Sequence, residues 1–155
     1  MNSWPPTRAT SGAFSPDRLR LDLVVPLTKE RVAAWLAAYV RAWETYTPDM
    51  IGDLFTDDAT YEYHPFEEPV RGRLAIVASW LENKDTPGTY EGRYEPIAID
   101  GDVAVAHGRS RYFTNASKAE LAREYDNLFL IRFDDQGRCR SIREWYMSPR
   151  GQQPA

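Results

Sequence analysis

Residues 54–72, LFTDDATYEYHPFEEPVRG, contain the pattern that decides the fold. The tyrosine-rich stretch 59–64 predicts a short strand, because aromatic residues favour extended, half-buried backbone. The proline-bounded stretch 65–69 predicts a loop, and Gly72 ends it directly before a segment, 73–82, whose apolar residues recur at helical spacing. A strand, a loop and a helix are therefore expected to follow one another here.

Upstream of this stretch the pattern is helical. Thr28 is a predicted N-cap, and Glu30 places a negative charge in the first turn, where it suits the helix dipole. The predicted buried stripe of this helix comprises Val32, Trp35, Leu36, Tyr39, Val40 and Trp43. Thr47 and Pro48 then predict the cap and the first position of a second, short helix.

Downstream of residue 88 the period changes from helix to strand. Four strands are predicted, at about 89–99, 103–114, 123–133 and 138–147. Gly101 and Gly137 lie where the first and last pairs would turn. Helices and strands that are segregated in this way predict an α+β fold.

Composition limits the possible functions. A chain of 155 residues predicts one domain at 28–148, with irregular segments at 1–27 and 149–155. A net charge of −4 argues against a nucleic-acid partner, and no apolar run reaches the ~20 residues of a membrane span. The one cysteine, Cys139, and an N-terminus without a secretory pattern predict a cytoplasmic protein.

The order of elements, the stretch 54–59, the tyrosine-rich strand, Pro65 and the stretch 69–72 together resemble the nuclear transport factor 2-like superfamily, in particular its SnoaL-like branch. The resemblance covers about residues 28–148. It implies a cone-like, curved antiparallel sheet wrapped around three helices, with one pocket at the wide end. The superfamily includes cofactor-free enzymes and non-catalytic binding proteins, so the fold alone does not give the function.

Comparison with ketosteroid isomerase, a member of this superfamily, implies roles for four positions. Tyr39 falls where that enzyme keeps its oxyanion-hole tyrosine. The position of the catalytic base is taken by Tyr63, or by His64 if one residue is inserted, and the position of the protonated aspartate is taken by Phe129. Two of three roles are changed, which argues against steroid isomerisation by that mechanism.

Comparison with limonene epoxide hydrolase implies a different set. Tyr61 keeps a tyrosine of the water-positioning segment, and Tyr63 replaces an asparagine. Arg109 keeps the bridging arginine, Arg111 replaces the acid that protonates the epoxide, and Glu144 follows an arginine as the water-activating carboxylate does. The loss of the proton donor argues against epoxide hydrolysis by that route.

Residue patterns along the last strands suggest how these side chains would act. Glu144, if it faced an aromatic pocket, would be a desolvated general base; on the outer face it would be a paired strand carboxylate. His107, Arg109 and Arg111 share one strand face. Facing inward they would bind an anionic group, and facing outward they would form a solvated stripe.

A coupled pocket pair of Glu144 and Arg109 is the sharpest expectation of this kind. Replacement of Glu144 by Gln should then leave Arg109 as a buried, unpaired cation and destabilise the protein by ~3–5 kcal/mol.

Further candidate ligand contacts are aromatic or amide side chains. Trp43 and Tyr39 would stack on a flat ligand, and Asn127 shares a strand face with Phe129. His64 would be either a base at the pocket mouth or a rim residue. His64 and His107 are the only histidines and lie far apart in sequence, so no metal is expected.

Two functions remain open. The first is a cofactor-free acid/base enzyme of isomerase, dehydratase, hydrolase or cyclase type, acting on a partly apolar, possibly carboxylated small molecule. The second is a non-catalytic ligand-binding or assembly module. In either case Leu128, Leu130 and Tyr112 are expected to remain on the outer face of the sheet and to form a homodimer contact.

Overall fold

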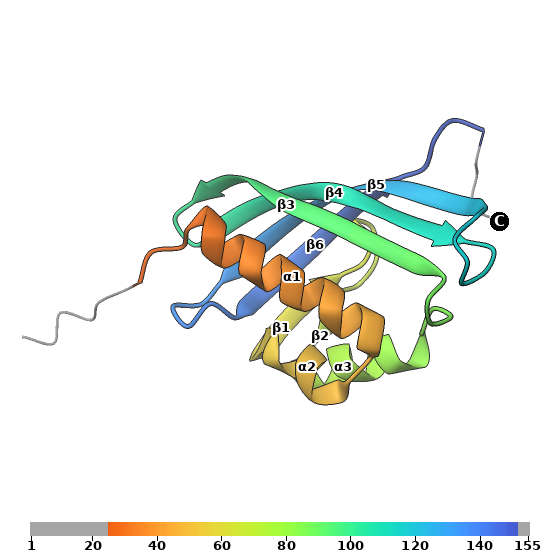
Figure 1. Cartoon of the computed structure of the whole chain (residues 1–155). Coiled ribbons are helices and arrows are strands. Elements are labelled where there is room, and N and C mark those ends of the chain that lie inside the picture. The colour runs from red at the N-terminus through yellow and green to blue at the C-terminus, as the bar shows by residue number, and fades with distance from the viewer. Residues whose placement is uncertain (1–24, 152–155) are drawn as a thin grey trace, which may run out of the picture.

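The computed structural model describes residues 25–151. In chain order they form α1 (Lys29–Thr45), α2 (Pro48–Asp53), β1 (Phe55–Glu62), β2 (Val70–Arg71), α3 (Arg73–Glu82), β3 (Tyr90–Asp100), β4 (Val103–Phe113), β5 (Leu121–Phe133) and β6 (Cys139–Met147). α1 lies across one side of a curved sheet, and α2 and α3 lie together next to β1 and β2 (Figure 1). The predicted α+β fold, a curved sheet around helices, is confirmed.

Two predicted segments fall largely outside these residues. The irregular arm expected at 1–27 and the tail expected at 149–155 include residues 1–24 and 152–155, which lie outside the described part of the chain. Both therefore stay predictions. Within residues 25–151, no helix is long and apolar enough to cross a membrane.

The ends of the first two helices follow from their capping residues. The Thr28 hydroxyl accepts the backbone N–H of Arg31 at 3.3 Å, as the predicted N-cap of α1 should. α1 ends at Tyr46, whose left-handed backbone (φ 49°) stops the helix. Pro48 begins α2 as predicted, but the Thr47 side chain makes no capping hydrogen bond.

The six strands form one sheet in the order β2-β1-β6-β5-β4-β3. All neighbours are antiparallel except β1 and β6, which run parallel, so the sheet is mixed rather than wholly antiparallel as expected. The parallel pair is possible because the rest of the sheet forms a long crossover between β1 and β6. The short β2 was expected to be part of a loop and instead pairs with β1.

Register assigns each strand residue to one of two faces. Ala106 of β4, Phe129 of β5 and Glu144 of β6 lie side by side, and the first two are buried beneath the helices. We call this the inner face. Arg109 lies beside Asp126 on the opposite, outer face, because strand residues of odd and even number point in opposite directions.

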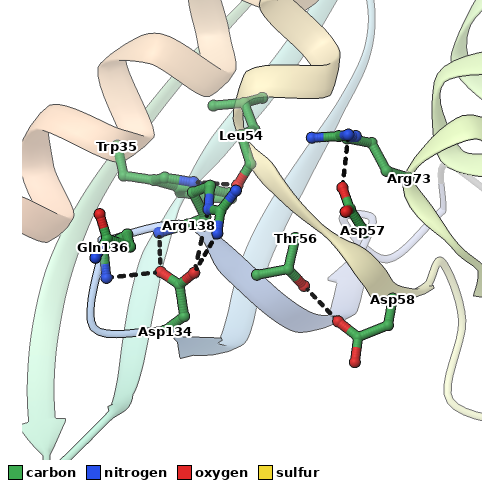
Figure 2. A network of polar contacts seen from close by, with 9 residues as sticks. All are labelled: Trp35, Leu54, Thr56, Asp57, Asp58, Arg73, Asp134, Gln136 and Arg138. Carbon is green, nitrogen blue, oxygen red and sulfur yellow. Dashed lines mark hydrogen bonds and ion pairs between the residues drawn. The ribbon is translucent and has the colours of Figure 1, made fainter.

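A cluster of polar contacts joins α1 to the β1–β6 junction (Figure 2). The Trp35 indole N–H donates to the backbone oxygen of Leu54 at 3.0 Å, which ties α1 to the residue before β1. Close by, the Asp134 carboxylate accepts the backbone N–H of Arg138 at 2.8 Å and its guanidinium at 3.1 Å, which closes the β5–β6 turn. Because Trp35 is fixed, Tyr39, one turn further along α1, is held over the inner face.

Candidate functional site: a cavity with a buried carboxyl group

A cavity of about 450 Å³ opens between the inner face of the sheet and the helices α1 and α3. Its inner end is lined by buried residues that include Tyr39, Tyr61, Trp80, Asn127 and Phe129. More exposed residues line its outer end: Glu67, Asn83, Arg123 and Tyr146. The cavity thus runs from the core of the domain to its surface.

Glu144 is the acidic residue at the inner end. One carboxylate oxygen, Oε1, accepts a hydrogen bond from the Tyr61 hydroxyl, and the Tyr39 hydroxyl lies 3.2 Å from the same oxygen and 2.6 Å from that of Tyr61. The other oxygen, Oε2, makes no hydrogen bond to any described residue. Because Glu144 lines the cavity, Oε2 is the oxygen that a ligand can reach.

The surroundings of Glu144 change its acidity. Burial among the rings raises the pKa of its carboxyl group to about 7, although the hydrogen bonds from Tyr61 and Tyr39 act to lower this pKa. Burial also raises the pKa of Tyr39 and of Tyr61 well above the ordinary value, so both remain neutral donors. Near pH 7, Glu144 can therefore either accept or release a proton.

A second set of hydrogen-bonded side chains, Tyr94, Ser110 and Asn127, crosses the inner face beside this carboxyl group. The Ser110 hydroxyl donates to the Asn127 side-chain oxygen at 2.9 Å and lies 2.6 Å from the Tyr94 hydroxyl, which must then be the donor to Ser110. Ser110 and Asn127 are both buried. These hydrogen bonds orient the Asn127 amide, so that its NH₂ group is a donor at the cavity wall.

The outer end of the cavity is built around Asp85. Its Oδ2 accepts the Trp43 indole N–H at 3.0 Å and the Tyr46 hydroxyl at 3.3 Å. Arg123 lies 3.9 Å from Oδ1 of the same carboxylate. These contacts hold the C-terminal end of α1 against the loop before β3 and keep the Trp43 ring at the cavity wall.

The three cationic candidates of β4 are not in the cavity. Arg109 and His107 contact Asp126 on the outer face, at 3.6 Å and 2.8 Å, and Arg111 lies 3.5 Å from Glu91. The Arg109 side chain is 64% exposed. The predicted pocket pair of Glu144 and Arg109 is therefore wrong, because the two side chains lie on opposite faces of the sheet.

His64 also lies outside the cavity lining. It is half-buried, its ring is 6.1 Å from that of Tyr146, and its Nδ1 accepts the backbone N–H of Phe66 at 3.4 Å. Tyr63 does line the cavity: its ring stacks on Tyr61 at 4.1 Å. The cavity brings together seven of the predicted site residues: Tyr39, Trp43, Tyr61, Tyr63, Asn127, Phe129 and Glu144.

Among the lining residues that the sequence did not predict, Ser110 and Tyr112 lie on β4, on the face opposite to that of Arg109. The signal was present in the small residues Ala104, Ala106, Gly108 and Ser110, which alternate along the strand. Small side chains at every second position indicate the face on which other elements approach closely. Tyr112 lies on this face and lines the cavity, so its expected place on the outer face is also wrong.

The described part of the chain contains no cluster of metal ligands. Among residues 25–151, no three His, Cys, Asp or Glu side chains lie close enough together to hold a metal ion. Cys139 is a free thiol buried at the start of β6, and burial raises its pKa, so it is an unreactive core residue.

Comparisons with known proteins agree with this architecture. The SnoaL-like domain family matches residues 36–142, more than half of the chain. An NTF-2-like protein of unknown function from Burkholderia xenovorans LB400 is 19% identical and superposes with a TM-score of 0.59, over 81% of this chain and 89% of that one; at this identity the likeness shows the fold alone. No curated protein matches the chain. The chain belongs to the SnoaL-like domain family and has the nuclear transport factor 2-like fold.

Proposed function

We propose that the cavity binds a small, partly apolar organic molecule and that Glu144 transfers a proton to or from it. One observation carries this proposal: a carboxyl group with a pKa of about 7 lines the cavity while two neutral tyrosines bind only one of its oxygens. A general acid or base works best when its pKa lies near the working pH. Isomerases, dehydratases, hydrolases and cyclases without cofactors all require such a step.

The proposal gives each group around the carboxylate a role. Oε2 would accept the proton, since Oε1 is held by Tyr61 and Tyr39. The two hydroxyls fix the orientation of the carboxyl group and stabilise its ionised form. The Asn127 amide and the Tyr94–Ser110 pair lie on the neighbouring wall, where they would bind a polar atom of the ligand.

Proton transfer can be tested before the natural substrate is known. Ketones and 1,3-dicarbonyl compounds that raise the melting temperature would be incubated with the protein in D₂O, and exchange of their acidic C–H protons followed by NMR. We expect the exchange rate to rise with pH and to level off above about pH 7, because the base must be ionised. Glu144→Gln should abolish the exchange catalysed by the protein.

The matched control is Asp126→Asn, which removes a carboxylate from the outer face. It should exchange these protons at the wild-type rate. If compounds bind in the cavity and yet exchange no faster than in buffer, the protein is the non-catalytic binding module that the sequence also allows.

We further propose a homodimer formed through the outer face of the sheet. Leu128 of β5 lies between His107 and Trp145 on this face and is 38% exposed, and Leu130 lies two residues along the same strand. In sedimentation at tens of micromolar we expect a dimer that Leu128→Asp dissociates. Leu74→Asp, on the exposed side of α3, is the control and should leave it intact. A wild-type monomer would contradict this proposal.

A cytoplasmic location remains part of the proposal, supported by the single cysteine, which cannot form a disulfide within the chain.

A further inference from the structure

The charges around the cavity are mostly negative. Its lining contains the carboxylates of Glu67, Asp85 and Glu144, and Arg123 is the only cationic side chain among the described residues that line it. Arg123 is 54% exposed and already lies 3.9 Å from Asp85. An anionic ligand would therefore meet Glu144 with no described cation beside it. The carboxylated ligand expected from the sequence depended on the cations of β4, which lie on the outer face.

More than half of the residues that line the cavity are aromatic. Four rings follow one another in edge-to-face contacts: Trp43 and Tyr112 at 6.0 Å, Tyr112 and Tyr125 at 6.0 Å, and Tyr125 and Tyr146 at 5.3 Å. The faces of aromatic rings carry negative electrostatic potential and attract cations. The Arg123 guanidinium already lies over the Tyr112 ring, 4.2 Å from its centre.

We propose that the ligand of this cavity is an organic ammonium ion, whose charge is neutralised by the Glu144 carboxylate and by the faces of the surrounding rings. This inference rests on the proposed function and names its ligand class. It is chemically consistent with proton transfer, because a nearby positive charge favours the ionised form of Glu144, which is the form that a base requires. The apolar rings would contact the carbon framework of the same ligand.

Three probes of one shape test the sign of the ligand charge. 4-(Trimethylammonio)benzyl alcohol and 4-tert-butylbenzyl alcohol differ only in N⁺ for C, and 4-tert-butylbenzoate supplies a negative charge. Their dissociation constants would be measured by calorimetry at pH 8, where Glu144 is ionised. We expect the cation to bind at least about tenfold more tightly than its neutral isostere, and the anion to bind most weakly.

Two variants locate the charge that is responsible. Glu144→Gln should reduce the ratio of the cation and isostere affinities by about threefold or more, whereas Asp126→Asn, with a carboxylate removed from the outer face, should leave the ratio unchanged. A ratio of one or less in the wild type, preferred binding of the anion, or an unchanged ratio in Glu144→Gln would overturn the inference.

The probes also separate this inference from the proposed function. Tighter binding of the neutral isostere would leave a small-molecule cavity with a different ligand class, and the proton exchange assay would still test its chemistry. Failure of all three probes to bind at millimolar concentration would overturn the ammonium inference and would also count against a small-molecule cavity.

Discussion

Glu144→Gln is expected to be more stable than the wild type at pH 8, by ~2–3 kcal/mol, and no more stable at pH 4. The pKa of Glu144 in the folded protein, about 7, lies above its ordinary value of 4.5. Between these values the folded state binds more protons than the unfolded state, so stability falls as the pH rises through this window and stays lower above it. Gln has no charge to lose and still presents an oxygen to Tyr39 and Tyr61.

Urea unfolding of both proteins across this pH range measures the effect. The matched control is Glu62→Gln. The Glu62 carboxylate accepts hydrogen bonds from the Arg143 guanidinium at 2.5 and 2.9 Å, and the positive charge of Arg143 stabilises its ionised form. That variant should be slightly less stable than the wild type at pH 8, because it loses this ion pair. A Glu144→Gln variant destabilised by several kcal/mol at pH 8 would instead mean that a cation neutralises Glu144 in the folded protein.

Gly108→Ala is expected to destabilise the protein by ~3 kcal/mol or more. A Cβ atom at this position in β4 would lie 2.0 Å from the backbone oxygen of Arg93 and 2.6 Å from the Tyr94 ring. Backbone of the neighbouring strand cannot move away without breaking the β3–β4 pairing. Gly108 therefore allows β3 to approach closely and sets the position of Tyr94 at the cavity wall.

Gly52→Ala is the control for this substitution. A Cβ atom at Gly52 in α2 would meet only the side chains of Arg73 and Val77, at 3.7 and 3.8 Å, which are ordinary contacts. Because alanine favours helix, this variant should be as stable as the wild type or more stable, by up to ~1 kcal/mol. Equal unfolding midpoints for the two variants would show that β3 does not approach Gly108 as described.

Much of the fold could be predicted from local pattern. Thr28 and the apolar stripe that follows it predicted α1, and Gly101 and Gly137 marked two hairpin turns, where both adopt positive φ. The parallel pairing of β1 with β6 could not be predicted in this way. It depends on contacts between residues about 80 positions apart, such as Tyr61 and Ile142.

The candidate site could be predicted only in part, because β4 has apolar residues on both faces. Val103 and Val105 lie on the outer face and Ala104 and Ala106 on the inner one, so alternation alone does not show which face is buried. The small side chains Ala104 and Ala106 face inward, as does Gly108, where a Cβ atom would meet Arg93 and Tyr94 of the neighbouring strand β3. For this reason the predicted pocket included three cations of the outer face and did not include Tyr112.

The resemblance predicted that Glu144 is a site residue, whereas the raised pKa of its carboxyl group results from packing. Nothing local in the sequence shows that Tyr39 on α1 and Tyr61 on β1 meet at one oxygen of a carboxylate on β6. The same is true of Asp85, which is held by Trp43 and Tyr46 from the far end of α1. Such clusters form only after the sheet and α1 have packed together.

Glu144 is expected to change its protonation state near neutral pH, because burial among the rings raises the pKa of its carboxyl group. A ¹³C NMR titration of the glutamate side-chain carboxyl carbons measures this directly, and Glu144→Gln identifies the resonance by its disappearance. We expect one glutamate to titrate with an apparent pKa close to 7. A Glu144 resonance that titrates near the ordinary value of 4.5 would contradict it.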